Sequence, residues 1–408
     1  MNPPLRTLLL FTLLLAPAAP AQVGWRDDAF ANPTTSGSSA LLARVHYPAT
    51  QAGQNAPLRS RAGGYPIVVF LHGYGGLGRN YPDLGDRLAA AGFIAVLSDT
   101  ARIELQVQRD DGIALLAALR QENARTASFW FGSLDTARAA VCGHSMGGGN
   151  TVRVLSANPG YRAGICFAPF NGLESTTSGV FSFAELHAPR VAVPLLILHG
   201  EGDTTLDWQR TAQAYYDKAN GYTGMKVFVR LDGDCTHMNV ARLDGSSTAV
   251  DRAVFQRSLD SAVGWLAAQL EGRPEGLEQV VGPALRAEPR LAQLQSAVRG
   301  PALWSDGPAL LGGTVGLRLA GEGGPAVLLI AAAPADLPTP FGRLRLDPAT
   351  TVWLNTAAIP AGGLQRTDVP IPNDPLLLGA RAWLQGAAQT DGVGLRLSNA
   401  IELVVTRR

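Results

Sequence analysis

The chain has 408 residues, with 34 basic and 33 acidic side chains, a formal net charge of +1 and three cysteines. This length exceeds that of one ordinary domain and predicts two. The balanced charge argues against a basic surface for nucleic acid or anionic lipid, and three cysteines in a chain of this size do not make a disulfide scaffold.

The first residues have the pattern of a secretory signal peptide. Arg6 precedes an apolar run over residues 8–15, and Ala19-Pro20-Ala21 fits the small-residue pattern of a cleavage site. The run is too short to span a bilayer, and no other segment is long and apolar enough to cross one. Residues 1–21 therefore predict export to the periplasm or the extracellular space, with a short uncleaved anchor as the alternative. Without Arg6 the mature chain is formally neutral.

Strand and helix patterns alternate over residues 22–272. Apolar strands are expected at 41–47, 65–71, 93–97, 138–142, 163–168, 194–198 and 225–229. Helices are expected at 81–91, 110–122, 148–157, 208–219 and 249–270. Near-continuous apolar strands separated by helices are typical of a mostly parallel sheet with both faces covered, which predicts an α/β domain.

The composition changes after this region. Residues 273–300 are expected to form a helical linker, interrupted by Pro283 and Pro289. Residues 301–408 contain short β-like runs at 314–319, 326–332, 351–354, 381–384, 394–397 and 401–405, separated by Gly- and Pro-rich turns. This pattern predicts a small all-β sandwich or barrel. It contains no histidine or cysteine, so our hypothesis for its role is attachment to a surface, a polymer or a protein partner.

Residues 141–149 read VCGHSMGGG and contain the pattern Gly-x-Ser-x-Gly around Ser145. An apolar strand precedes the pattern, and a helix-compatible stretch follows it. In this setting the glycines allow a turn that strains the serine backbone and holds its hydroxyl clear of the sheet. The segment therefore predicts a serine nucleophile.

A serine hydroxyl needs a base, and the base needs an orienting acid, in the chain order Ser, Asp or Glu, His. Asp203 follows the predicted strand 194–198 and is the expected acid, with Glu201 and Asp207 as alternatives. His237 follows the strand 225–229 and is the only histidine after Asp203, which predicts that it is the base.

Acyl transfer also needs N–H donors for the developing oxyanion. One should be the amide of Met146, directly after the nucleophile. The second should come from the loop His-Gly-Tyr-Gly-Gly at 72–76, where we expect the N–H of Tyr74, with Gly75 as the alternative. A merely structural tight turn is the competing interpretation of this loop.

The remaining features have simpler interpretations. The other five histidines lack metal-ligand spacing, so no metal and no cofactor is expected. Cys142 and Cys166 would lie on neighbouring parallel strands, where a bond is strained, so two buried thiols are favoured over a disulfide. The Ser- and Thr-rich segment 171–190 is either a partial cap over the site or a solvated surface loop.

These motifs resemble the α/β-hydrolase family of chlorophyllases, platelet-activating-factor acetylhydrolases and bacterial cutinase-like polyester hydrolases. The similar stretches, within residues 40–270, are PIVVFLHGYGG (66–76), AVCGHSMGGG (140–149), PLLILHGEGDTT (194–205) and GDCTHMN (233–239). The resemblance implies oxyanion amides at Tyr74 and Met146 and a substrate pocket that these residues share with Phe170 and Leu206. Some relatives link the acid and histidine loops by a disulfide; Cys235 has no counterpart near Asp203, so that bridge is expected to be absent.

We therefore expect a secreted serine hydrolase that cleaves carboxylic esters with short to medium acyl groups, or polyester-like substrates. A peptidase or thioesterase with the same three residues is an alternative within the same chemistry. A surface-binding protein with a vestigial hydrolase domain is an alternative of another class, although decay would be expected to remove at least one of the three residues.

Overall fold

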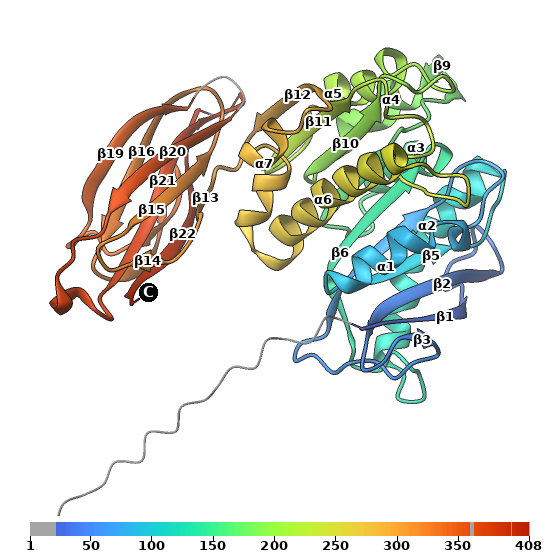
Figure 1. Ribbon diagram of the computed structural model, residues 1–408. Helices are drawn as coiled ribbons and strands as arrows, with labels where there is room; N and C mark the ends of the chain where they lie inside the picture. Colours follow the sequence, from blue (N-terminus) through green and yellow to red (C-terminus); the bar gives the residue numbers. More distant parts are fainter. Residues whose placement is uncertain (1–21, 360–362, 393, 408) are drawn as a thin grey trace, which may run out of the picture.

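The computed structural model describes residues 22–359, 363–392 and 394–407, so the predicted signal peptide lies outside the described residues. A ten-stranded sheet organises the first region, in the order β12-β11-β10-β7-β6-β4-β5-β2-β1-β3 (Figure 1). Its parallel centre consists of β5 (Ile94–Ser98), β4 (Tyr65–Leu71), β6 (Leu134–His144), β7 (Ala163–Phe167), β10 (Leu195–Gly200) and β11 (Met225–Leu231). Its margins consist of β2 (Ala40–Ala49), β1 (Gln22–Ala31) and β3 (Gly53–Gln54) on one side and β12 (Leu291–Val298) on the other.

The central strands send alternate side chains into two separate cores. In β4, Ile67, Val69 and Leu71 belong to one core, whereas Val68 and Phe70 belong to the other. Alternation of this kind follows from the two-residue period of a strand. Because both faces are buried, the strand must be apolar at nearly every position, which explains its uninterrupted run of hydrophobic residues.

Helices cover each face of the sheet, as predicted. The first core is closed by α2 (Leu105–Ala124), α3 (Met146–Ser156), α4 (Phe183–His187) and α5 (Ala214–Lys218). The second core is closed by α1 (Pro82–Ala90), α6 (Ala249–Glu271), the 3-10 helix η4 (Pro274–Gln279) and α7 (Pro283–Arg286). The predicted α/β fold class is confirmed, and it is the α/β-hydrolase arrangement.

The expectation of a helical linker over 273–300 is wrong in its second half. The helical turns η4 and α7 end by residue 286, and residues 291–298 form β12, antiparallel to β11. Pro289 prevents the helix from continuing, and the open edge of β11 offers unpaired backbone groups that a strand satisfies better than a loop does. The segment is therefore part of the sheet rather than a spacer.

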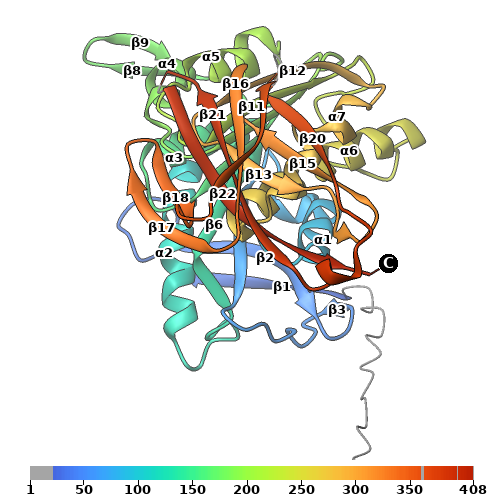
Figure 2. The ribbon, with the colours of Figure 1, turned by 90° about the vertical axis from the view of Figure 1, so that its left-hand side faces the viewer.

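The second region is a β sandwich with a hairpin at its side (Figure 2). One sheet contains β13 (Ala302–Ser305), β15 (Thr314–Ala320) and β20 (Leu364–Pro370). The other contains β14 (Ala309–Leu310), β22 (Gly394–Thr406), β21 (Arg381–Thr390), β16 (Gly324–Ala331) and β19 (Val352–Ile359), and the hairpin is β17 (Pro334–Thr339) with β18 (Gly342–Leu346). Leu317 and Leu319 of the first sheet meet Leu328 and Leu384 of the second in a small core. The runs 394–397 and 401–405 are one continuous strand, β22, rather than two.

The two regions share part of a core. The Trp304 side chain is 1% exposed and belongs to the core beneath α6, and its Nε1 donates to Glu278 at 2.9 Å. On the other side of the joint, the Tyr222 hydroxyl donates to the Asp391 carboxylate at 2.7 Å. The sandwich is therefore packed against the α/β region and not merely tethered to it.

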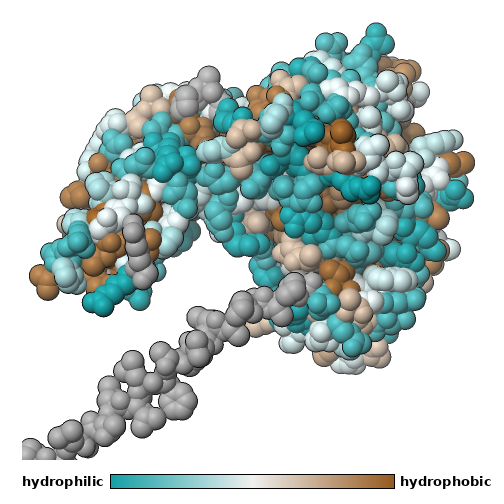
Figure 3. All heavy atoms as spheres, in the orientation of Figure 1, coloured by the Kyte–Doolittle hydropathy of each residue, from teal (hydrophilic) through white to brown (hydrophobic). Residues whose placement is uncertain are grey.

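The outer face of the molecule is mixed in character. Hydrophobic residues are scattered among hydrophilic ones on the face that Figure 3 shows. Among the described residues, no helix has both the length and the apolarity that crossing a bilayer requires. The three cysteines are free and buried, so Cys142 and Cys166 are two thiols as predicted.

Candidate active site

Ser145 occupies the sharp turn between β6 and α3. Its backbone has φ 54° and ψ −115°, a conformation that non-glycine residues rarely adopt. The flanking glycines leave the room that this turn needs: a Cβ at Gly143 would collide with the Gly147 backbone, and one at Gly147 would collide with the Leu71 carbonyl. The strain is therefore held in place by close backbone packing, which fixes where the serine hydroxyl lies.

The structure brings Ser145, His237 and Asp203 together at the carboxyl ends of the strands. His237 Nε2 lies 3.0 Å from Ser145 Oγ, and His237 Nδ1 lies 2.7 Å from Asp203 Oδ2. Because an ionised carboxylate only accepts hydrogen bonds, Nδ1 carries the proton and Nε2 is free to accept from the serine. This is the geometry of a nucleophile, a base and an orienting acid.

Neither alternative acid reaches the imidazole. Glu201 pairs with Arg230 at 3.2 Å, and Asp207 accepts the backbone N–H of Gln209 at 2.7 Å. Both are thus engaged in local interactions of the loop and the following helical turn.

The Asp203 carboxylate is held ionised although its side chain is fully buried. Burial by itself would raise the pKa of Asp203, but the hydrogen bond with His237 and the N–H of Leu206 lower this pKa below its usual value. His237 bonds Oδ2 of this carboxylate, whereas the N–H groups of Thr205 and Leu206 both donate to Oδ1 at 2.8 Å. A second imidazole nitrogen, His199 Nε2, lies 3.5 Å from Oδ2. The carboxylate is consequently fixed from both sides.

The loops that carry Asp203 and His237 pack backbone against backbone. A Cβ at Gly200 would collide with the carbonyl of Cys235, and a Cβ at Gly202 would collide with that of Gly233. Cys235 is free. Glycine-mediated packing therefore holds these loops together without a disulfide.

Two backbone amides beside the serine hydroxyl are available to a ligand. In the described part of the chain, neither the Tyr74 nor the Met146 N–H donates to a protein acceptor. Met146 opens α3, where N–H groups lack intrahelical partners and favour negative charge. Gly75, the alternative donor, gives its N–H to the Arg102 carbonyl at 2.8 Å.

A hydrogen-bonded chain that the sequence did not indicate links these parts. The Gly73 N–H donates to Tyr81 Oη at 3.1 Å, this hydroxyl lies 2.9 Å from His144 Nδ1, and His144 Nε2 lies 2.6 Å from the His237 carbonyl. Burial, and then the neighbouring His237, lower the pKa of His144 to about 3, so the ring is neutral at ordinary pH. Since a carbonyl only accepts, Nε2 carries the proton and the Tyr81 hydroxyl donates to Nδ1. This series of hydrogen bonds connects the loop 72–76, which contains Tyr74, to the loop of His237.

Besides His199, which lies beside Asp203, three other histidines lie in local contacts of their own. His46 Nδ1 pairs with Asp86, and His187 Nε2 pairs with Glu174. The two ring nitrogens of His72 each lie 2.8 Å from a carbonyl oxygen, of Gly73 and of Thr100, and in the neutral ring one of them donates. Nowhere in the described ranges do three or more His, Cys, Asp or Glu residues gather in a group that could hold a metal ion.

An apolar cavity of about 310 Å³ opens beside Ser145. Its lining includes all four residues expected in the pocket: Tyr74, Met146, Phe170 and Leu206. Leu105 and Thr205 also line it, and neither carried a local sequence signal. No described residue of 171–190 lines the cavity; this segment forms the hairpin of β8 (Leu173–Thr176) and β9 (Gly179–Ser182) followed by α4. In this conformation it is a surface hairpin and not a cap over the cavity.

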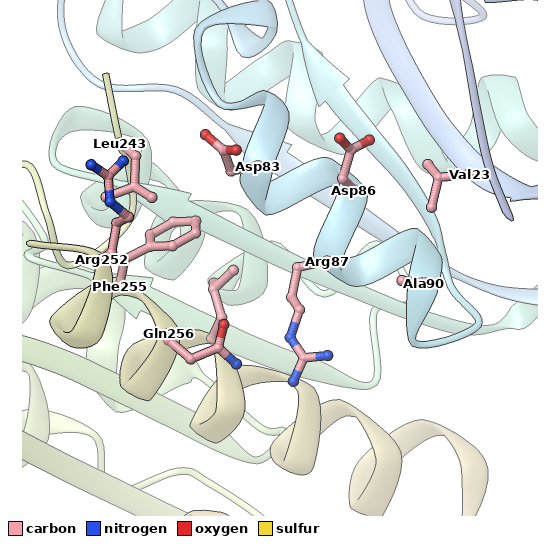
Figure 4. Close-up of a pocket in the computed structure, with 10 residues that line it drawn as sticks. Val23, Asp83, Asp86, Arg87, Ala90, Leu243, Arg252, Phe255 and Gln256 are labelled. Carbon is pink, nitrogen blue, oxygen red and sulfur yellow. The ribbon is translucent and has the colours of Figure 1, made fainter. Parts of the chain in front are cut away.

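Two further cavities differ in their relation to the serine. A polar cavity of about 410 Å³ lies on the His237 side of Ser145 and includes Arg242 in its lining. A larger one, of about 470 Å³, lies between α1 and α6 and is lined by Asp83, Asp86, Arg252 and others (Figure 4). Of the described residues lining this larger cavity, none is a serine, cysteine or histidine. The larger cavity therefore lacks the nucleophile and base side chains that line the cavities at Ser145.

Comparisons with known proteins identify the family of the chain. A family described as PET hydrolase-like matches residues 31–260, more than half of the chain. Cutinase 1 of Thermobifida cellulosilytica is 32% identical over 174 residues, 42% of this chain and 60% of that protein. The bis(hydroxyethyl) terephthalate hydrolase of Streptomyces coelicolor is 31% identical over 183 residues, 45% of this chain and 54% of that protein. The chain thus spans between half and two thirds of the length of these relatives. Because the family match covers more than half of the chain, including most of the α/β region and all three residues that meet at the strand ends, we conclude that the chain belongs to the PET hydrolase-like family.

Proposed function

We propose that the chain hydrolyses carboxylic esters through an acyl-enzyme on Ser145. The hydrogen-bonded chain from Asp203 through His237 to Ser145, placed on a strained turn, carries this proposal. The relatives named cutinase and bis(hydroxyethyl) terephthalate hydrolase support ester, and in particular polyester, substrates.

The reaction begins when His237 Nε2 takes the proton of Ser145 Oγ as that oxygen attacks the ester carbonyl. The carbonyl oxygen becomes an oxyanion, which the N–H groups of Tyr74 and Met146 stabilise. His237 then gives the proton to the leaving alcohol, and the C–O bond of the ester breaks. Water, activated by the same imidazole, cleaves the acyl-enzyme and releases the acid. Asp203 keeps His237 in the required tautomer throughout, and no step requires a cofactor.

The apolar cavity suggests which acyl groups are accepted. At about 310 Å³, bounded by Phe170 and Leu206, it suits short to medium acyl chains or a segment of a polyester. The predicted signal peptide supports export, which would bring the protein to polymeric substrates outside the cell.

Hydrolysis of p-nitrophenyl esters with acyl chains of two to sixteen carbons tests the proposal. We expect the highest kcat/KM for the short or medium chains, and we expect Ser145→Ala to abolish nearly all turnover while the protein remains folded. Near wild-type activity in Ser145→Ala would contradict the catalytic assignment. A clear optimum at the longest chains would contradict the proposed acyl preference only.

A further inference from the structure

The cleft at Ser145 has two arms of different chemistry. The apolar cavity extends from the serine toward Phe170 and Leu206, whereas the polar cavity extends from the same serine toward His237 and Arg242. Ser145, Tyr74 and Thr205 line both. A bound ester would therefore place its two halves in different surroundings.

The proton transfer decides which half enters which arm. His237 Nε2 must reach the oxygen of the leaving alcohol, and this imidazole lines the polar cavity but not the apolar one. Met146 and Phe170, by contrast, line only the apolar cavity. The alcohol half thus belongs to the polar arm and the acyl half to the apolar arm.

Arg242 is an unpaired cation in the polar arm. In the portion of the chain that the structure describes, it forms no ion pair, and its buried Nε has no hydrogen-bond acceptor. Its guanidinium lies over the ring of Tyr81, with the central carbon 5.9 Å from the ring centroid. None of the described residues accepts a hydrogen bond from the Arg242 side chain, so a ligand that supplies acceptor oxygens to the terminal nitrogens of the guanidinium is favoured.

The surroundings favour an anion rather than a neutral acceptor. No aspartate or glutamate is among the described residues that line the polar cavity. Asp244, two residues along the chain, is exposed and accepts hydrogen bonds from Ser246; Arg242 helps to lower the pKa of this carboxyl, but the two side chains form no ion pair. The catalytic carboxylate, Asp203, is fully buried behind His237 and bonded to it. Arg242 is therefore the only permanently charged side chain facing this arm among the residues described.

We propose that the polar arm is a carboxylate subsite in which Arg242 binds the free acid at the end of the alcohol half of the substrate. The substrate class is then the ester of a hydroxycarboxylic acid, including the carboxyl-terminal unit of a hydroxy-acid oligoester. A guanidinium matches a carboxylate through two parallel hydrogen bonds, which a neutral diol end cannot offer. This inference rests on the proposed ester hydrolysis, because it uses the direction in which the alcohol leaves.

The test compares 4-(butanoyloxy)butanoate with 4-(butanoyloxy)butanamide. Both have a butanoyl group and a four-carbon alcohol half, which ends in a carboxylate in the first compound and in a neutral amide in the second. The same pair is also measured with a six-carbon alcohol half, so that the distance from the ester to the terminal group is varied. We expect the wild type to prefer the carboxylate in kcat/KM by about 10-fold for at least one length, the effect typical of a charge-assisted hydrogen bond. Arg242→Gln should bring this ratio to about one. Arg252→Gln, an arginine of the cavity between α1 and α6, is the matched control and should keep the wild-type ratio.

A binding measurement separates this inference from the proposed function. Calorimetry with Ser145→Ala protein should show tighter binding of the carboxylate ester than of the amide, and the double variant with Arg242→Gln should lose the difference. Ester hydrolysis with equal ratios in wild type and Arg242→Gln would overturn the subsite and leave the proposed function standing. Selective binding without turnover of any ester by the wild type would overturn the proposed function and leave the subsite standing. Absence of both hydrolysis and selective binding would overturn both.

Discussion

The α/β region and the β sandwich bury their strands differently. Every residue of β4, β5, β7 and β10 is buried, whereas most residues of β19 and β20 are exposed or only partly buried. A strained serine and a fully buried carboxylate persist only where the surrounding structure fixes them, and a sheet covered on both faces provides this. In the sandwich the small core between the two sheets and the joint at Trp304 are buried, but many strand residues remain exposed. The site therefore depends on the doubly covered sheet.

The largest expected difference between the regions comes from replacing one aspartate in each by asparagine. Asp203→Asn should reduce kcat/KM for p-nitrophenyl butyrate by about 10⁴-fold, because an amide no longer holds His237 in the productive tautomer. Asp368→Asn is the control: this residue forms an exposed ion pair with Arg366 at 2.6 Å in the sandwich and should leave activity unchanged. Retention of more than a tenth of the activity in Asp203→Asn would contradict the role of this acid.

The joint between the regions can be probed with two tryptophans of the sandwich. Trp304→Ala should lower the free energy of unfolding by about 4 kcal/mol, because this 1% exposed side chain fills the core beneath α6. Trp353→Ala, where the side chain is 71% exposed, should change it by less than about 0.5 kcal/mol. Both values come from urea denaturation. Equal effects would mean that the two regions do not share a core.

Replacing a glycine in each region should also change the free energy of unfolding unequally, by less than the tryptophan variants do. Gly147→Ala should cost about 3 kcal/mol, because its Cβ would collide with the Leu71 backbone and move the serine turn. Gly307→Ala in the sandwich adds a Cβ with no atom within 4 Å and should have little effect on stability. Thermal unfolding of the two variants measures the difference. If Gly147→Ala were as stable as the wild type, the turn would not be held by backbone packing.

A smaller effect is expected from the hydrogen bonds that link the loop of Tyr74, through Tyr81 and His144, to the loop of His237. Tyr81→Phe removes the hydroxyl between Gly73 and His144, and we expect kcat to fall by about 10-fold with KM little changed. Tyr161→Phe is the matched control, since it removes a buried hydroxyl that donates to the Gly112 carbonyl away from the site. Both variants should lose similar stability, but only Tyr81→Phe should lose activity. Equal kcat values in the two variants would remove Tyr81 from the positioning chain.

The sequence predicted the parts of the molecule whose pattern is local. The serine turn lies in a Gly-x-Ser-x-Gly segment between a strand and a helix, and the apolar central strands are unmistakable in composition. His237 could be identified by elimination, because no other histidine follows Asp203. In each case the signal is contained in a few consecutive residues or in chain order.

Other parts could not be predicted because they depend on distant partners. Residues 291–298 contain good helix formers, yet they pair as a strand with the open edge of β11. Tyr81, His144 and Arg242 come from three separate segments and have no shared spacing that would indicate a common site. Their relation to Ser145 follows only from the packing of the loops at the end of the sheet.

The most direct test of the central claim is covalent labelling of the folded wild-type protein by a fluorophosphonate, followed by mass spectrometry of its peptides. The three converging side chains predict one label per chain, on Ser145, with labelling much slower in His237→Ala because the base is gone. Failure of the folded protein to react, or reaction at another serine with Ser145 unmodified, would contradict the assignment of Ser145 as an activated nucleophile.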